Sequence, residues 1–174
     1  WEKMKQEFSL PLSVAEYIQQ MTALRQAMIK RDGIRVIPHV QEFVKGLSQA
    51  GLKLAVASSS SLAEIKVNLA EIGLSEYFSE VVSTEEVEHS KPAPDVYLAA
   101  AERIGIMPEN CLGIEDTKNG TGAVRNAGMV CVGFANPAFP KQDLAFADRV
   151  VSSFSELDAD SLTKIYQKVR ASHA

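Results

Sequence analysis

Residues 111–120 read Cys-Leu-Gly-Ile-Glu-Asp-Thr-Lys-Asn-Gly. The apolar run 111–114 is typical of a short buried strand, and two adjacent carboxylates, Glu115 and Asp116, follow it directly. Carboxylates at the end of a buried strand are costly unless a cation lies beside them, and open α/β sheets bind their ligands at that edge. Mg²⁺ prefers such hard oxygen ligands, often together with a substrate phosphate. A magnesium site and a simple helix cap both remain open for this stretch alone.

A second strand-like run, residues 52–57, ends in four consecutive serines. Ser61 and Glu64 have the spacing of a capping box that begins the next helix. Helix capping explains Ser61 but not the three serines that precede it, Ser58 to Ser60. Hydroxyls and backbone N–H groups in a strand-to-helix turn can bind an anion, so this turn is a candidate anion site.

A third strand-like run, residues 81–83, is followed by a loop that contains Ser-Lys-Pro-Ala-Pro-Asp at 90–95. Lys91 places a cation in this loop, beside two prolines that stiffen the chain. A lysine before a proline is most often a solvated loop residue. Its position between the two other polar strand ends is what makes Lys91 a candidate site residue.

The order of these three features resembles motifs two, three and four of the haloacid dehalogenase superfamily. Ser-Lys-Pro-Ala-Pro-Asp and Gly-Ile-Glu-Asp-Thr look most like the branch that holds β-phosphoglucomutase and phosphatases of small metabolites. The resemblance runs from about residue 13 to the C-terminus. It implies that an aspartate of a first motif, Asp-x-Asp, attacks a phosphoryl group and forms an aspartyl-phosphate, which water or a second acceptor resolves. The second aspartate would serve as general acid and base.

The same resemblance implies a role for each candidate residue. Glu115 and Asp116 would hold the cofactor, Mg²⁺. Ser58 and the amide of Ser59 would bind the oxygens of the transferring phosphoryl group. Lys91 would offset the charge that gathers there, so that Lys91 and Ser58 count as the catalytic residues of this chain. Such roles suit phosphoryl transfer, which depends mainly on positioning and on charge neutralisation.

The expected function is therefore that of a Mg²⁺-dependent hydrolase, a phosphatase of small, sugar phosphate-like metabolites. Ser61 stands where a basic residue would strengthen phosphate anchoring, which favours a phosphatase over the alternative, a β-phosphoglucomutase-type phosphotransfer. An alternative of another class is a non-catalytic binding or regulatory protein that kept the fold. A dinucleotide loop is disfavoured, because Arg125 stands where the third glycine or alanine belongs.

The first motif has no counterpart upstream of Ser58. Asp-x-Asp occurs in the chain at Asp158-Ala159-Asp160, but there it follows residues 154–157 and not a buried apolar strand. We interpret Asp160 as the cap of the final helix. We therefore expect the nucleophile to lie outside these 174 residues, on a strand that precedes Trp1, and the 174 residues alone to be inactive.

Short apolar runs alternate with helical stretches over residues 34–174. This alternation predicts an α/β fold of three layers, a Rossmann-like parallel sheet between two layers of helices. The helices are expected to stop at Gly73, Gly105 and Gly128. The strands are expected near 53–57, 81–83, 111–114, 130–134 and 149–151. In the superfamily the strand of the first motif lies between the strands of motifs two and four, so without it those two strands would lack a neighbour.

Residues 1–33 are expected to form the C-terminal part of a helical cap, and residues 34–174 the core domain without its first strand. Ser13 and Glu16 have the spacing of a capping box. An apolar stripe follows on one helical face, which we interpret as core packing: Val14, Ile18, Met21, Leu24 and Met28. A second amphipathic helix is expected from Pro38 to Gly51, and we leave the nearby His39 outside the site.

The composition is that of an ordinary globular protein, with 46% hydrophobic and 23% charged residues. A net charge of −4 without a basic block disfavours nucleic-acid and membrane binding. Cys111 and Cys131 both fall in predicted strands, which favours free buried thiols over a disulfide. We expect a cytoplasmic protein, monomeric or weakly homo-oligomeric, whose partner is a small phosphorylated substrate. Whether the Lys91–Pro92 bond is cis or trans stays open.

Overall fold

The computed structural model describes residues 2–172, and the chain divides into two compact units between Arg35 and Val36. The first unit consists of the helices α1 (Glu2–Glu7) and α2 (Val14–Asp32). α2 begins with the predicted capping box, in which the Ser13 hydroxyl accepts from the Glu16 N–H and the Glu16 carboxylate accepts from the Ser13 N–H.

The apolar stripe of α2 is not buried. Ile18, Met21, Leu24 and Met28 are between 48 and 62% exposed, and α2 has no buried residue. The interpretation of this stripe as core packing is therefore wrong for the part of the chain that the structure describes. Helical spacing identifies an apolar face, but it does not identify the surface that covers that face.

The second unit alternates strands and helices in the predicted order. Each predicted strand is present, with bounds that differ from the prediction by two residues at most. The strands are β1 (Ala55–Ser58), β2 (Glu80–Ser83), β3 (Leu112–Glu115), β4 (Val130–Phe134) and β5 (Arg149–Val151). The helices are α3 (Val40–Gln49), α4 (Leu62–Glu71), α5 (Asp95–Arg103), α6 (Lys118–Asn126) and α7 (Ala159–Ala171), with short 3₁₀ turns η1 (Ser75–Tyr77), η2 (Thr84–Glu86), η3 (Pro108–Asn110) and η4 (Phe154–Glu156).

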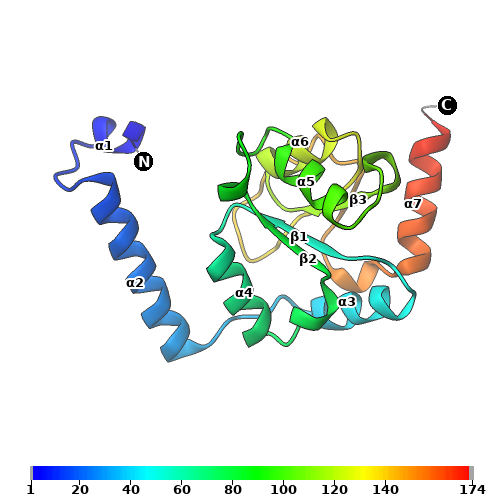
Figure 1. Ribbon diagram of the computed structural model, residues 1–174, viewed down its shortest axis with the longest axis horizontal. Helices are drawn as coiled ribbons and strands as arrows, with labels where there is room; N and C mark the ends of the chain where they lie inside the picture. Colours follow the sequence, from blue (N-terminus) through cyan, green and yellow to red (C-terminus); the bar gives the residue numbers. More distant parts are fainter. Residues whose placement is uncertain (1, 173–174) are drawn as a thin grey trace. The chain divides into compact units, whose positions relative to one another are not determined.

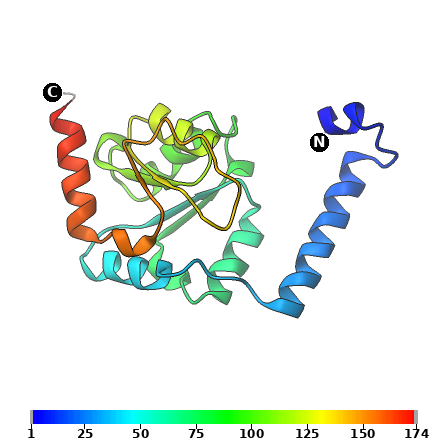
Figure 2. The ribbon, with the colours of Figure 1, turned by 180° about the vertical axis from the view of Figure 1, so that it is seen from behind.

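Helices cover both faces of the strands, which confirms the three-layer α/β fold. α5 packs on β1 and β2, and α6 packs on β3 and β4, while α3 and α4 lie on the opposite side (Figure 1; Figure 2 gives the view from behind). Alternation along β4 divides the core accordingly. Val132 and Phe134 join the cluster of Phe43 from α3, whereas Cys131 joins the cluster of Val124 from α6.

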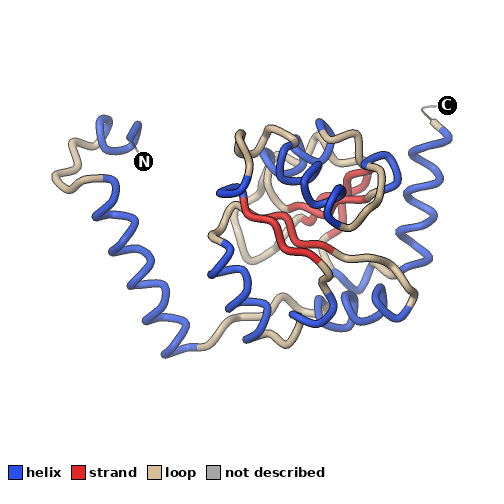
Figure 3. Tube along the Cα trace, in the orientation of Figure 1, coloured by secondary structure: helices blue, strands red, loops and turns tan. Residues whose placement is uncertain are grey.

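The strands form two separate parallel sheets (Figure 3). β1 pairs with β2, with Ser58 opposite Ser83, and β3, β4 and β5 pair in that order. Among the described residues, no ladder joins β1 to β3. The interruption lies between the strand of Ser58 and the strand of Glu115, where the sequence predicts a further strand. That further strand stays a prediction.

The final helix begins differently from the prediction. Asp158, not Asp160, is the N-cap of α7: its Oδ1 accepts from the Ser161 N–H at 2.7 Å, and the Ser161 hydroxyl accepts from the Asp158 N–H at 2.8 Å. The assignment of the cap to Asp160 is wrong because the helix starts at Ala159, which places Asp160 in its first turn. Periodicity locates a helix, but it does not settle which of two nearby aspartates has the cap geometry.

Two further expectations concern the thiols and the membrane. Cys111 and Cys131 are free cysteines, as predicted, but only Cys131 is buried within a strand: Cys111 is partly buried and lies just before β3. Within residues 2–172, no helix has the length and apolar character needed to cross a bilayer.

Candidate active site

The side chain of Lys91 connects the carboxyl ends of β1 and β3. Lys91 lies on the loop between η2 and α5, and its peptide bond to Pro92 is cis. Its ammonium donates to the carbonyl oxygen of Ala57, at 3.1 Å, and forms an ion pair with Oε1 of Glu115. Because Ala57 directly precedes Ser58, the structure brings all three predicted motifs to one edge of the sheets.

Tyr97, in the first turn of α5, completes this contact. Its hydroxyl accepts from Lys91 Nζ at 3.2 Å and donates to Glu115 Oε1, and the ammonium lies 4.9 Å from the centroid of the tyrosine ring. Burial, and then the charge of Glu115, raise the pKa of Tyr97 far above its ordinary value. The hydroxyl therefore keeps its proton at neutral pH and acts as a donor to Glu115.

The sequence analysis did not identify Tyr97 as a site residue. The available signal was its place on the buried face of a helix that begins only a few residues after Lys91. Tyrosine is often buried for its ring alone, so this signal does not distinguish a site residue from a core residue.

The Glu115 carboxylate is held on its other side as well. Its Oε2 accepts from the backbone N–H of Asp116 at 3.2 Å. Thr117 caps α6 by accepting from the Gly120 N–H at 3.0 Å, which places Gly120 against the carboxylate. A Cβ atom on Gly120 would lie 2.0 Å from Glu115 Oε2. Glycine at position 120 is therefore required by the position of the Glu115 side chain.

Asp116, which directly follows Glu115, is exposed to solvent. Desolvation raises the pKa of its carboxyl, and the neighbouring Glu115 carboxylate raises it further, whereas Lys91 opposes the shift. Within residues 2–172 there is no group of three or more His, Cys, Asp or Glu side chains placed to hold a metal ion. Glu115 and Asp116 nonetheless supply hard carboxylate oxygens, and Mg²⁺ is commonly held by one or two carboxylates together with substrate phosphates.

The serine turn after β1 is fixed by bonds to its own backbone and to β2. The Ser58 hydroxyl accepts from the Ser60 N–H at 3.1 Å, and the Ser83 hydroxyl donates to the Ser60 carbonyl oxygen at 2.7 Å. Ser59 is exposed at the tip of this turn. Ser61 caps α4 in the predicted capping box with Glu64. The turn therefore has a defined conformation, with Ser58 and Ser59 at the same edge as Lys91.

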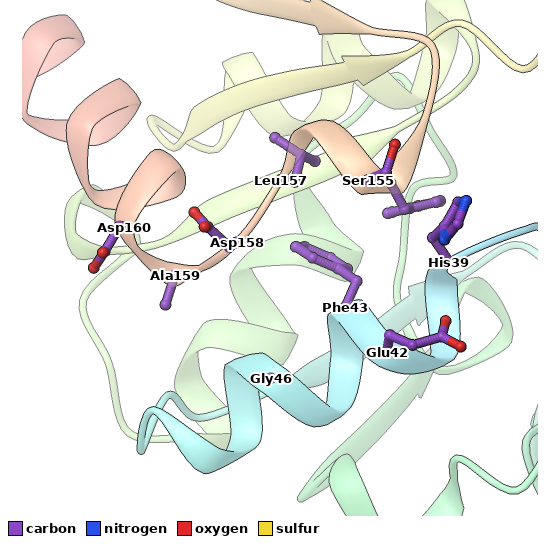
Figure 4. A pocket seen from close by; sticks show the side chains of 10 residues that line it. His39, Glu42, Phe43, Gly46, Ser155, Leu157, Asp158, Ala159 and Asp160 are labelled. Atoms are coloured by element: carbon purple, nitrogen blue, oxygen red, sulfur yellow. The ribbon is translucent and has the colours of Figure 1, made fainter.

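The grooves on the described part of the second unit differ in how they relate to the predicted site residues. One, of about 670 Å³, borders Asp116 and Thr117 on one side and the loop after β4, including Asn136 and Lys141, on the other. The second, of about 410 Å³, runs between α3 and the start of α7, past His39 (Figure 4). The second groove contains none of the five predicted site residues, whereas the first borders Asp116 and so adjoins the candidate active site.

Comparisons with known proteins agree with this description. The family model of the haloacid dehalogenase-like hydrolases matches residues 2–134. The bifunctional riboflavin kinase/FMN phosphatase of Arabidopsis thaliana is 34% identical over 155 residues, which are 87% of this chain and 40% of that protein. The chain spans 40 to 65% of the length of the first curated relatives that it matches.

Solved structures of known proteins also share the fold of this chain. CbbY from Rhodobacter sphaeroides, solved in complex with phosphate and, as a mutant, with xylulose-(1,5)bisphosphate, has a TM-score of 0.75 at 29% identity, covering 84% of this chain and 67% of that one. β-Phosphoglucomutase from Clostridium difficile has a TM-score of 0.79 at 23% identity, covering 98% of this chain and 78% of that one, a likeness that concerns the fold alone.

Proposed function

The chain belongs to the haloacid dehalogenase-like hydrolase family, and on this basis we propose that the protein is a Mg²⁺-dependent phosphatase of small phosphorylated metabolites. The observation that carries the proposal is the convergence of Lys91 with Glu115 and Asp116 at the carboxyl edge of the strands. This edge is where open α/β folds bind their ligands, and it brings a cation and two carboxylates together.

The proposed roles follow from what each group can donate or accept. Ser58 and the amide of Ser59 offer donors to the oxygens of a phosphoryl group, and the turn that carries them is already ordered. Lys91 supplies a fixed positive charge, whose position is set by Ala57 and Glu115. Because phosphoryl transfer concentrates negative charge, a cation held in place before the substrate arrives lowers the barrier.

Glu115 and Asp116 are the residues that would hold Mg²⁺. The metal, when bound, would neutralise phosphate charge and orient the phosphoryl group. The orientation of Glu115 does not depend on the metal, because Lys91, Tyr97 and the backbone of Asp116 hold its two oxygens.

The nucleophile of the proposed reaction is an aspartate that lies outside these 174 residues. It would form an aspartyl-phosphate, and water would then release inorganic phosphate. Two observations support this part of the proposal. The ladder between β1 and β3 is interrupted beside Lys91 and Glu115, and the chain spans only part of the length of its relatives. A strand that ends in Asp-x-Asp at the interruption would place a carboxylate beside Lys91.

The substrate class is inferred from the relatives, among which are an FMN phosphatase and a protein crystallised with a sugar bisphosphate. A β-phosphoglucomutase-type transfer to a second sugar hydroxyl is the other candidate, and the shared fold does not distinguish the two reactions. Ser61 favours the phosphatase, because it begins α4 as a neutral cap where a basic residue would anchor a second phosphate. We further propose that the first unit is the remaining part of a helical cap.

The test uses the complete protein that contains this chain. Inorganic phosphate release and isomerised sugar phosphate would be measured on sugar monophosphates, sugar bisphosphates and FMN, with Mg²⁺ and with a chelator. A phosphatase releases phosphate only with Mg²⁺, whereas a mutase converts one sugar phosphate into another without net release. Phosphate binding without either product would instead support the non-catalytic alternative.

A further inference from the structure

We propose that Tyr97 is a positioning residue, whose hydroxyl fixes the ammonium of Lys91 and the carboxylate of Glu115 relative to each other. This inference rests on the proposed function, because it assigns Tyr97 a role in the same site. Tyr97 touches neither the phosphoryl group nor the metal in this proposal, and it acts only through its two neighbours.

A group that bonds to both Lys91 and Glu115 must be able to donate one hydrogen bond and accept another. An ammonium only donates and a carboxylate only accepts, whereas a hydroxyl does both. The Tyr97 hydroxyl accepts from Lys91 and donates to Glu115, so it is hydrogen-bonded to both members of the ion pair. With the carbonyl oxygen of Ala57, the three donors of the ammonium each have an acceptor. The direction of the Lys91 side chain is therefore fully determined.

Packing does not account for the hydroxyl. Tyr97 is 7% exposed and belongs to the core cluster that includes Val96, Ala100 and Ala101. Phenylalanine would fill the same space without a polar atom. A buried hydroxyl is costly unless it is hydrogen-bonded, and the partners of this hydroxyl are Lys91 and Glu115, two of the charged residues of the site. Tyrosine at position 97, in place of phenylalanine, is therefore explained by the hydrogen bonds within the site and not by packing in the core.

The test compares two substitutions in the complete protein, Tyr97→Phe and Tyr166→Phe. The control removes a hydroxyl that also makes two hydrogen bonds, to the Glu109 carbonyl oxygen at 3.0 Å and to Asn110 Oδ1 at 3.1 Å. We expect Tyr97→Phe to lower kcat by about tenfold or more, with KM changed by less than about twofold, because a bond to a charged group is lost where charge develops. Tyr166→Phe should leave both constants within about twofold of the wild type.

A second measurement does not depend on activity. Thermal unfolding without Mg²⁺ would be compared for the wild type, Tyr97→Phe, Lys91→Met and the double variant. If the hydroxyl acts on Lys91, the shift in Tm of the double variant is smaller than the sum of the two single shifts. Additive shifts, or a wild-type kcat for Tyr97→Phe, would overturn the inference. A wild type that releases no phosphate with Mg²⁺ would instead overturn the proposed function, and the unfolding cycle would still report whether the contact exists.

Discussion

Lys91 and Glu115 form an ion pair across the interruption between the two sheets, and their side chains are only 11% and 10% exposed. Removing two charges from water is expensive, and a buried pair often adds little to the stability of a fold. A pair placed at the carboxyl edge of the strands, with a tyrosine hydroxyl bonded to both partners, is better explained by the chemistry of a site.

The first prediction concerns Lys91→Ala in the complete protein. We expect kcat to fall by about 10²–10³-fold at saturating substrate and Mg²⁺, because a fixed cation is lost where negative charge develops. We also expect the free energy of unfolding to fall by about 3–5 kcal/mol, because Glu115 is left buried without its cation. Steady-state kinetics and urea unfolding measure the two effects.

The control for stability is Lys118→Ala. Lys118 pairs with Asp143 at 2.9 Å, but both side chains are more than half exposed, so its loss should change unfolding little. Equal destabilisation by the two lysine substitutions would contradict the assignment of Lys91 to a buried, structured pair.

The second prediction concerns Asp116→Asn. This change preserves the shape of the side chain and removes its charge, so the affinity for Mg²⁺ should fall and turnover should decrease by orders of magnitude. Calorimetry with Mg²⁺ alone and a Mg²⁺ titration of phosphate release would measure both. Asp143→Asn removes the same charge from the exposed pair with Lys118 and should leave the Mg²⁺ dependence unchanged. Normal activity of Asp116→Asn across the titration would exclude Asp116 as a ligand.

The third prediction concerns the glycine beside Glu115. Alanine is normally favoured over glycine inside a helix, yet Gly120→Ala should destabilise the protein by about 1–3 kcal/mol, because the new Cβ overlaps the Glu115 carboxylate. Displacement of this carboxylate should also lower kcat. The matched control is Gly46→Ala in α3, where a Cβ would meet no atom within 4 Å. This control should stabilise the protein by about 0.5–1 kcal/mol. Similar effects at the two positions would show that Glu115 moves freely.

The fourth prediction separates the two aspartates near the start of α7. Asp158→Ala should lower Tm, and Asp160→Ala should lower it less, because only Asp158 makes the capping box with Ser161. The backbone N–H of Ser161, and then its side chain, hold the pKa of Asp158 below its ordinary value. The stability from this cap is therefore present above the ordinary pKa of the carboxyl and is lost as the pH falls through the lowered pKa. Melting curves from neutral to acidic pH should show the two proteins, wild type and Asp158→Ala, converging at low pH.

The order of strands and helices followed from the sequence because it depends on local signals. Short apolar runs of strand length, separated by helices that are each followed by a glycine with positive φ (Gly73, Gly105 and Gly128), place each strand of the second unit within two residues. The candidate residues Ser58, Lys91 and Glu115 were also found locally, as polar groups at or near strand ends. Their meeting at one edge follows from parallel topology, in which the carboxyl ends of all strands point the same way.

The sequence by itself therefore determined the layers, the strand positions and the chemical types of the site residues, because each rests on patterns within a few consecutive turns or strands. The tertiary structure alone decided the contacts that are distant along the chain. Tyr97 and Glu115 are 18 residues apart, and their bond depends on how α5 packs against β1 and β2. The space that Gly120 leaves for Glu115 likewise depends on which surfaces come together in three dimensions, and no periodicity along the chain encodes that.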